Sequence, residues 1–251
     1  MTASSSIAFA SAGEFIASVL RLRPRLAVFD CDGTLWSLDS GEAFFYWELE
    51  RGLVPPDLDQ WARRRYHEYR AGRVSEEQMC GEMVTLHRGI ACELLERAAR
   101  QFFSEQVASA IFPDMLTLTD KLSASGCELW AVSSTNDWVV RAGAERFGIP
   151  GERVLATCVQ VLDGVATDRL VRVPSGPGKA AAVREAIGRA PDVAFGNSIY
   201  DLELLEAARH PFVINPNREL EELALQRGWP VYWPESTGHG RVQPKAGLSG
   251  G

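Results

Sequence analysis

Two aspartates stand two residues apart in a setting that suits catalysis. Asp30 and Asp32 directly follow the apolar run Leu26–Phe29, and Gly33 comes next. Because side chains alternate along an extended chain, both carboxylates are expected to project the same way from the end of a strand. Two carboxylates this close repel each other unless a cation or a shared proton lies between them, and hard oxygen ligands suit Mg²⁺. The pattern predicts a cation site, although a solvated turn uses the same residue types.

A pair of serines follows a second apolar run. Residues 128–132 are typical of a buried strand, and Ser133 and Ser134 come directly after it, ahead of a predicted helix. A hydroxyl at the end of a strand and beside the start of a helix is well placed to hold a phosphate oxygen. Simple capping of the helix explains the same residues equally well.

A lysine opens a further predicted helix. Lys179 follows the glycine- and proline-rich loop 174–178, where a lysine is usually a surface residue. The stretch is not the phosphate loop of nucleotide-binding proteins. Val173 replaces the first glycine of that loop, and Ala180 replaces its serine or threonine.

The last polar group follows the predicted strand 192–195, where Gly196 leads into Asn197 and, four residues later, Asp201. Apolar runs and helical stretches alternate from residue 113 onward, with a β-hairpin expected around Asp163-Gly164. This alternation predicts an α/β fold, and open sheets of that class bind ligands at the carboxyl ends of their strands.

A long segment interrupts the alternation after the first strand. Between residues 36 and 111 the apolar residues recur at helical spacing and no β-rich run appears. We therefore expect an all-helical insert of three or four helices, rich in arginine and aromatic residues.

Composition limits the classes of function. The chain has 251 residues, 46% of them hydrophobic and 24% charged, which is ordinary for a soluble globular enzyme. Its formal net charge of -7 gives no electrostatic support to a nucleic-acid partner, and no apolar run is long enough to span a membrane. The five cysteines are scattered without a Cys-x-x-Cys pair, so neither a zinc site nor a disulfide framework is indicated, and the cytoplasm is the expected compartment.

Taken in chain order, four of these stretches resemble the four motifs of the haloacid dehalogenase (HAD) superfamily of phosphohydrolases. They are Asp30-Cys-Asp-Gly-Thr-Leu35, Ser133, Lys179 and the segment 196–201. The resemblance implies a Rossmann-like, doubly wound parallel sheet. The insert stands where HAD enzymes carry a C1-type helical cap, and residues 208–230 resemble the carboxyl end of phosphoserine-phosphatase-like members. The resemblance also implies a core of residues 1–35 and 112–238 and a cap of residues 36–111. Residues 239–251 are expected to form a flexible tail, because the end of the chain is rich in glycine, serine and lysine and has little to bury.

The resemblance assigns roles to the polar residues. Asp30 is expected to attack phosphorus and form an aspartyl-phosphate. Asp32 is expected to protonate the leaving oxygen and then activate the water that cleaves this intermediate. Ser133, with Ser134 as the neighbouring alternative, and Lys179 are expected to hold the phosphoryl oxygens.

The same resemblance implies Mg²⁺ as the cofactor. The expected ligands are the side chain of Asp30, the main-chain carbonyl of Asp32, Asn197 and Asp201. Asn197 departs from the family, which usually has an aspartate there. An amide oxygen coordinates Mg²⁺ without adding charge, so a weaker metal site is expected unless Asp201 compensates.

The substrate expected from the resemblance is a small phosphomonoester. Phosphoserine phosphatases bind their amino acid through a glutamate and an arginine of the cap. Asp39 or Glu42 matches the acidic residue, whereas Met83 stands where a rough alignment places the arginine. The aromatic residues of the insert would alternatively suit a cationic or apolar alcohol phosphate.

The presence of Asp32 favours a phosphatase over a dehalogenase, because a dehalogenase has no alkoxide to protonate. Two other functions use the same residues. A phosphotransferase would pass the phosphoryl group to a second alcohol, and a metal-poor pseudoenzyme would only bind a phosphorylated ligand. The sequence does not address the oligomeric state.

Overall fold

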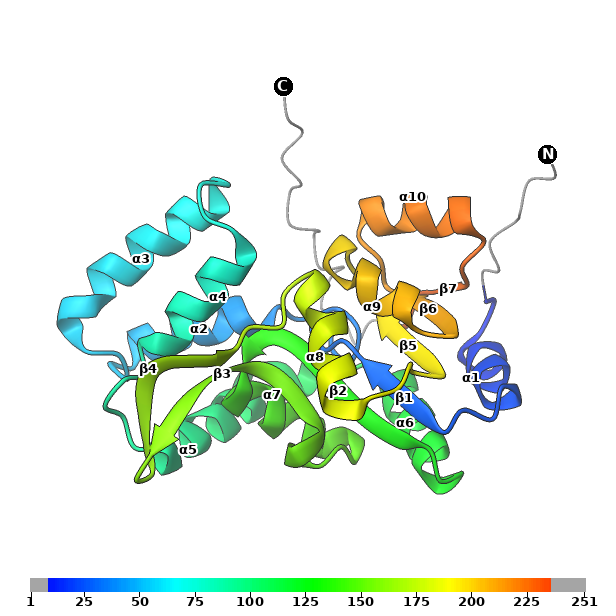
Figure 1. Cartoon of the computed structure of the whole chain (residues 1–251), viewed down its shortest axis with the longest axis horizontal. Helices are drawn as coiled ribbons and strands as arrows, with labels where there is room; N and C mark the ends of the chain where they lie inside the picture. Colours follow the sequence, from blue (N-terminus) through cyan, green and yellow to red (C-terminus); the bar gives the residue numbers. More distant parts are fainter. Residues whose placement is uncertain (1–8, 236–251) are drawn as a thin grey trace.

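The computed structural model describes residues 9–235, in which seven strands form one sheet in the order β4-β3-β2-β1-β5-β6-β7 (Figure 1). All neighbouring strands run parallel except β3 and β4, which form the expected hairpin. The predicted doubly wound sheet is confirmed, while the predicted tail lies outside the described residues. The strands are β1 Leu26–Phe29, β2 Glu128–Asn136, β3 Val154–Leu162, β4 Val165–Arg172, β5 Val193–Gly196, β6 His210–Ile214 and β7 Val231–Tyr232.

Helices cover both faces of this sheet. One face packs against α1 (Ala12–Arg21), α5 (Cys92–Phe102), α6 (Pro113–Ala124) and α7 (Asp137–Ala144). The other packs against α8 (Pro177–Ile187), α9 (Leu202–Ala207) and α10 (Arg218–Arg227). Strand β1 alternates between the two apolar clusters: Ala27 and Phe29 belong to the first, and Leu26 and Val28 to the second. Burial on both faces explains why this strand has no polar residue until it ends at Asp30.

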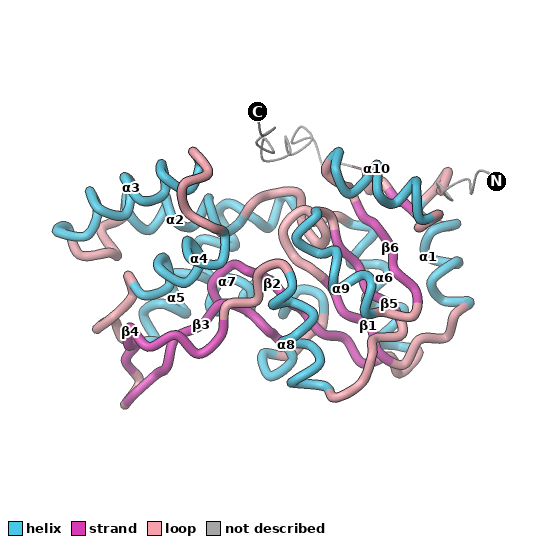
Figure 2. The backbone as a smooth tube through the Cα atoms, turned by 45° about the horizontal axis from the view of Figure 1, so that its top comes forward, coloured by secondary structure: helices cyan, strands magenta, loops and turns pink. Residues whose placement is uncertain are grey.

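The segment after β1 is helical, as expected. It contains α2 (Ser40–Glu50), α3 (Pro56–Arg70), α4 (Glu76–Thr85) and α5, followed by short turns of π-helix, Phe103–Val107, and 3₁₀-helix, Ala108–Ala110. Helices α2, α3 and α4 lie together at one end of the molecule (Figure 1, Figure 2). They share a small apolar cluster of their own, in which the rings of Phe45 and Tyr66 stack 4.8 Å apart.

Helix α5 packs against the α/β core. Its Leu95, Ala99 and Phe102 belong to the large core cluster, and it packs against α7 of the α/β core. The last helix of the segment therefore contributes to the same packing as the sheet, whereas the cap limits at residues 36 and 111 stay a prediction.

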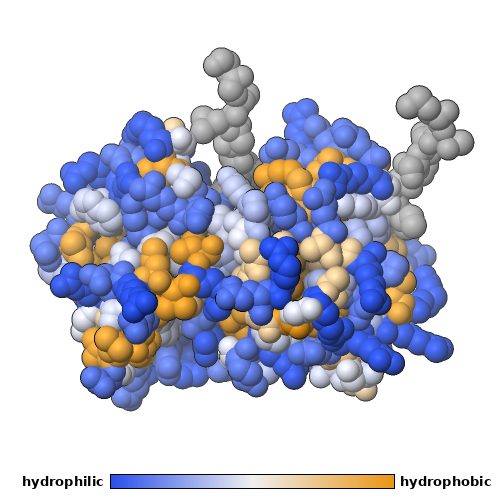
Figure 3. Space-filling view, in the orientation of Figure 1, coloured by the Kyte–Doolittle hydropathy of each residue, from blue (hydrophilic) through white to orange (hydrophobic). Residues whose placement is uncertain are grey.

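The β3–β4 hairpin forms one edge of the sheet. Apolar side chains gather on the surface over its tip (Figure 3), where Val161 and Leu162 are exposed. No helix among the described residues is long and apolar enough to cross a membrane.

The order of the strands identifies where a ligand would bind. The chain steps from β1 outward to β2 and β3, and later returns to place β5 on the opposite side of β1. In open α/β sheets, ligands bind outside the carboxyl ends of the strands at such a reversal. Asp30 follows β1 directly, and its main-chain N–H donates to the carbonyl of Phe195 in β5, 2.9 Å away.

Candidate active site

A buried lysine joins two aspartates at the reversal between β1 and β5. The Nζ atom of Lys179 lies 2.7 Å from Oδ1 of Asp30 and 2.6 Å from Oδ1 of Asp201. Burial alone would lower the pKa of Lys179, but the charges of Asp201 and Asp30 outweigh burial and raise that pKa. Lys179 is therefore an ammonium that offsets the two carboxylates.

The protonation of Asp30 is sensitive to its surroundings. Burial, and then the negative charge of Asp201, raise the pKa of Asp30 to about 7, although Lys179 acts to lower it. Its Oδ2 atom accepts a hydrogen bond of 2.8 Å from the hydroxyl of Thr34. A cation or further donors beside Asp30 would lower this pKa and keep the carboxylate charged, as a nucleophile requires.

Asp201 organises the turn that follows β5. Its Oδ2 atom accepts bonds from the main-chain N–H groups of Asn197, at 2.9 Å, and Ser198, at 3.0 Å. A Cβ atom on Gly196 would lie 2.5 Å from the Cβ of Asp201, so only glycine lets the strand end this close to the carboxylate. Asp201 thus fixes the turn with one oxygen and Lys179 with the other.

Asn197 reaches across to the loop after β1. A Cβ atom built on Gly33 would lie 1.8 Å from Nδ2 of Asn197, and Gly33 has a φ of +80°. The backbone conformation favours glycine at position 33, and a larger residue there would force the amide of Asn197 to move. The expected metal-binding amide therefore lies against the Asp30–Gly33 loop.

Asp32 is held by four donors. Its Oδ1 atom accepts bonds from the indole N–H of Trp36 at 2.7 Å and from the main-chain N–H and hydroxyl of Ser40, at 2.7 and 2.6 Å. Its Oδ2 atom accepts a bond of 2.7 Å from the hydroxyl of Thr135. Burial, and then the charge of Asp39, raise the pKa of Asp32, while the bonds from Ser40 and Thr135 lower it. A raised pKa is what a carboxylic acid needs to donate a proton near neutral pH.

The predicted phosphate serines lie where β2 is irregular. The strand does not end at residue 132 but continues to Asn136, because pairing with β3 resumes there after a shift in register between Ser133 and Asn136. Ser133 is buried, and its hydroxyl accepts a bond from the N–H of Thr135. The carbonyl of Ser134 accepts a bond of 2.8 Å from the hydroxyl of Thr157. Their contact with phosphate stays a prediction.

The two predicted substrate acids begin helix α2. Asp39 caps the helix by accepting a bond of 3.0 Å from the N–H of Glu42. Glu42 lies 3.5 Å from Nη1 of Arg70, at the end of α3. Both acids are one turn or less from Ser40, which contacts Asp32, so they are close along the chain to a proposed catalytic carboxylate.

The oxygen donors at this edge fit Mg²⁺. Among residues 9–235 no group of three or more histidine, cysteine, aspartate or glutamate side chains is arranged to hold a metal. The expected ligand set has only two carboxylates, those of Asp30 and Asp201, and adds the amide of Asn197 and the carbonyl of Asp32. Mg²⁺ is commonly bound by one or two carboxylates together with water and substrate phosphate, so this set is adequate.

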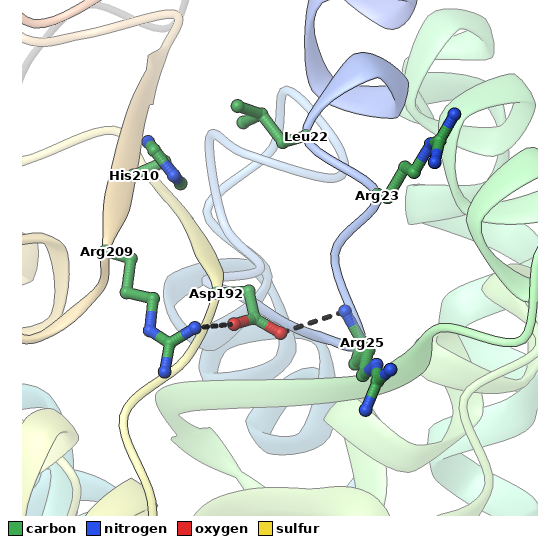
Figure 4. A pocket seen from close by; sticks show the side chains of 6 residues that line it. All are labelled: Leu22, Arg23, Arg25, Asp192, Arg209 and His210. Atoms are coloured by element: carbon green, nitrogen blue, oxygen red, sulfur yellow. Dashed lines mark hydrogen bonds and ion pairs between the residues drawn. The ribbon is translucent and has the colours of Figure 1, made fainter.

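Two hollows in the surface of the described residues lie away from Asp30. One hollow of about 180 Å³ opens at the amino ends of β1, β5 and β6 (Figure 4). Asp30 lies at the other end of these strands, their carboxyl end. Asp192 there accepts bonds from the guanidinium of Arg209 and from the main-chain N–H of Arg25. These bonds tie the starts of the strands together, which is a structural role. Charge and position in the sheet, rather than hollow size, place the candidate active site at Asp30.

Several contacts of the site were not predicted from the sequence. Thr34 and Trp36 each lie four residues beyond the aspartate that they contact, a spacing that could have indicated them. Thr135 is 103 residues away from Asp32, and no local pattern joins the two.

Comparison with known proteins identifies the family of the chain. The family model for haloacid dehalogenase-like hydrolases matches residues 27–206. Histidinol-phosphatase of Neisseria meningitidis is 26% identical over 217 residues, which cover 82% of this chain and 97% of that protein. Phosphoserine phosphatase SerB1 of Mycobacterium tuberculosis is 30% identical over 137 residues, 52% of this chain and 44% of that protein.

Solved structures share the fold. A protein of unknown function from Bordetella pertussis Tohama I superposes with a TM-score of 0.72 at 27% identity, covering 83% of this chain and 98% of the other. A substrate-bound phosphoserine phosphatase superposes with a TM-score of 0.56 at 18% identity, over 85% of this chain and 94% of the other. At 18% identity, the similarity to the phosphoserine phosphatase structure is evidence for a shared fold alone.

Proposed function

Since the chain belongs to the haloacid dehalogenase-like hydrolases and is a phosphatase, we propose that it hydrolyses a small phosphomonoester through an aspartyl-phosphate on Asp30. The observation that carries the proposal is the buried group of Asp30, Lys179 and Asp201 at the reversal of strand order. Uncatalysed hydrolysis of phosphomonoesters is extremely slow, so an enzyme must gather positive charge around the phosphoryl group and hold a nucleophile in line with the leaving oxygen.

The reaction has two steps. In the first, a carboxylate oxygen of Asp30 forms a bond to phosphorus while the bond from phosphorus to the alcohol oxygen breaks, and Asp32 gives its proton to that oxygen. In the second, Asp32 takes a proton from water, the water oxygen attacks phosphorus, and the bond to Asp30 breaks. Inorganic phosphate leaves, and both aspartates return to their starting states.

Two other groups hold the phosphoryl oxygens in this proposal. The ammonium of Lys179 already lies 2.7 Å from the nucleophile, which supports a role in binding the charge that is transferred. Ser133, buried at the irregular end of β2, is the proposed hydroxyl partner. Asp201 keeps Lys179 in place.

Mg²⁺ would be held by Asp30, Asp201, Asn197 and the carbonyl of Asp32. When bound, it would neutralise the charge shared by the phosphoryl group and the nucleophile. Selectivity for the alcohol is proposed to come from the segment 36–111, because the first turn of α2 contacts Asp32 through Ser40.

A phosphate-release screen tests the proposed function. Purified protein is incubated with p-nitrophenyl phosphate and a panel of small phosphomonoesters, with Mg²⁺ or with EDTA, beside Asp30→Asn. We expect turnover that requires both Mg²⁺ and Asp30. Added alcohols that capture the phosphoryl group would identify a phosphotransferase instead. Absence of turnover on the whole panel, with ligand binding retained, would identify a pseudoenzyme and overturn the proposal.

A further inference from the structure

We propose that Thr135 is a positioning residue for the proton transfer carried out by Asp32. The inference rests on the proposed function, in which Asp32 protonates the leaving oxygen. Its basis is the bond of 2.7 Å from the hydroxyl of Thr135 to Oδ2 of Asp32, made between residues 103 positions apart.

The two oxygens of Asp32 have different surroundings. Oδ1 receives three donors, one from Trp36 and two from Ser40. A carboxylate oxygen has two lone pairs, so three donors leave Oδ1 no room for a proton. Oδ2 accepts one bond, from Thr135, and keeps a free lone pair. The proton that passes to the leaving oxygen is therefore carried on Oδ2, and Thr135 fixes the direction of its remaining lone pair.

The irregularity of β2 is what brings Thr135 to this place. Ser133 pairs with Ala156 and Asn136 with Thr157, so Ser134 and Thr135 are two extra residues that are not paired with any residue in the β2–β3 ladder. Such a bulge changes the direction in which a side chain points, and bulges are frequent beside active sites. If β2 and β3 paired regularly at this point, the side chain of Thr135 would not point toward Asp32.

Crowding keeps the hydroxyl in position. Thr135 is 7% exposed, and a Cβ atom on Gly41 of helix α2 would lie 2.7 Å from its Oγ1. The threonine therefore lies between Asp32 and the first turn of α2. Ser40 of that turn donates to the other oxygen of Asp32. The carboxyl group therefore accepts hydrogen bonds from strand β2 of the core, through Thr135, and from the helical segment, through Ser40.

A leaving group that needs no proton separates positioning from general structural damage. p-Nitrophenolate departs as a stable anion, whereas a simple alkoxide must be protonated as the bond breaks. The constant kcat/KM reports the steps up to release of the alcohol, so it isolates the proton donation by Asp32 from the later hydrolysis of the aspartyl-phosphate.

The experiment compares kcat/KM for p-nitrophenyl phosphate and for an alkyl phosphate in Mg²⁺-containing buffer. The proteins are the wild type, Thr135→Val, Thr135→Ser and Thr157→Val. Thr157→Val is the matched control, because its hydroxyl bonds to Ser134 in the same bulge and does not touch Asp32. We expect Thr135→Val to lower kcat/KM about tenfold for the alkyl ester, which is the order of magnitude expected for the loss of one hydrogen bond to a charged group. For the aryl ester kcat/KM should fall about twofold or less. Thr135→Ser should restore the alkyl activity, and Thr157→Val should affect both esters equally.

Three results would overturn the inference. The first is an equal loss on both esters for Thr135→Val, the second is a gain on the alkyl ester, and the third is failure of Thr135→Ser to restore activity in a folded protein. If circular dichroism shows that Thr135→Val is unfolded, Thr135→Ala makes the same comparison. Inactivity of the wild type on every ester would overturn the proposed function and this inference together, whereas an active wild type with uniform losses would overturn this inference alone.

Discussion

Asn197 occupies the space that a side chain at Gly33 would need: a Cβ atom there would lie 1.8 Å from its Nδ2 atom. The loop that carries Asp30 and Asp32, the two proposed catalytic residues, is thus packed directly against the turn after β5. The same glycine has a φ of +80°, a conformation that L-residues seldom adopt. The contact couples the loop of the proposed nucleophile, Asp30, to the amide that is the expected metal ligand.

Gly33→Ala should therefore damage both stability and activity. An L-residue in the left-handed region costs about 1–2 kcal/mol, and overpacking against Asn197 should add about 1–3 kcal/mol. Thermal and urea unfolding measure the loss in free energy, and phosphate release measures the loss in turnover. Gly52→Ala is the matched control, because Gly52 has a φ of +66° and a Cβ atom there would meet nothing within 4 Å. Equal destabilisation by the two substitutions would show that Asn197 yields without cost.

Asp30→Asn should abolish turnover while the protein stays folded. An amide cannot form the acyl-phosphate, so the rate of phosphate release should fall by about three orders of magnitude or more. Phosphate release and near-ultraviolet circular dichroism check the two parts of the prediction. A variant that kept a sizeable fraction of wild-type activity would exclude Asp30 as the nucleophile.

The stability of the metal-free protein should depend on pH through the same residue. Burial and the charge of Asp201 raise the pKa of Asp30 from 3.8 to about 7. The folded protein then binds this proton more tightly than the unfolded chain. The associated stability is fully present below pH 3.8 and is lost as the pH rises through about 7.

Melting temperatures of the wild type and Asp30→Asn in EDTA check this dependence. Because the amide introduced by the substitution does not ionise, the melting temperature of the variant relative to wild type should increase between about pH 5 and pH 8, the window that the raised pKa sets. Addition of Mg²⁺ at the upper pH should stabilise the wild type more than the variant. A difference that is the same at both pH values would show that Asp30 does not titrate in this range.

Asn197→Asp should strengthen the binding of Mg²⁺. A carboxylate adds a negative charge where the amide offers only a dipole, so the half-saturating Mg²⁺ concentration should fall by about tenfold, equivalent to ~1.4 kcal/mol. Mg²⁺ titrations of phosphate release measure it. An unchanged titration would mean that Asn197 does not ligate the ion. Asp201→Asn would then be the informative variant, judged beside its melting temperature because Asp201 also fixes the turn after β5.

The sequence is most informative where the chemistry of neighbouring residues decides the structure. Leu26–Phe29 is recognisable as a buried strand because it is apolar throughout and ends at an acid, and the structure places β1 at those residues. Lys179 is predictable as a partner of Asp30 only through the order of motifs, since the two are 149 residues apart.

The contacts of Asp32 show the limit of prediction from neighbouring residues. The extension of β2 to Asn136 depends on pairing with β3, which no property of residues 133–136 encodes by itself. The bond from Thr135 follows from that pairing, so it is visible only in three dimensions. In the same way, the packing of α5 against α7 depends on the tertiary arrangement of the core, which the sequence of α5 alone does not specify.

The proposed catalytic group is assembled from segments that are far apart in the chain. The bonds from Lys179 and Thr135 to the two aspartates span 149 and 103 residues. Contacts of such long range close large loops, and they form late when a protein folds. Recovery of activity after dilution from denaturant should consequently follow the slowest folding phase. Helix formation, which needs only local contacts, should be complete before the first ester is hydrolysed.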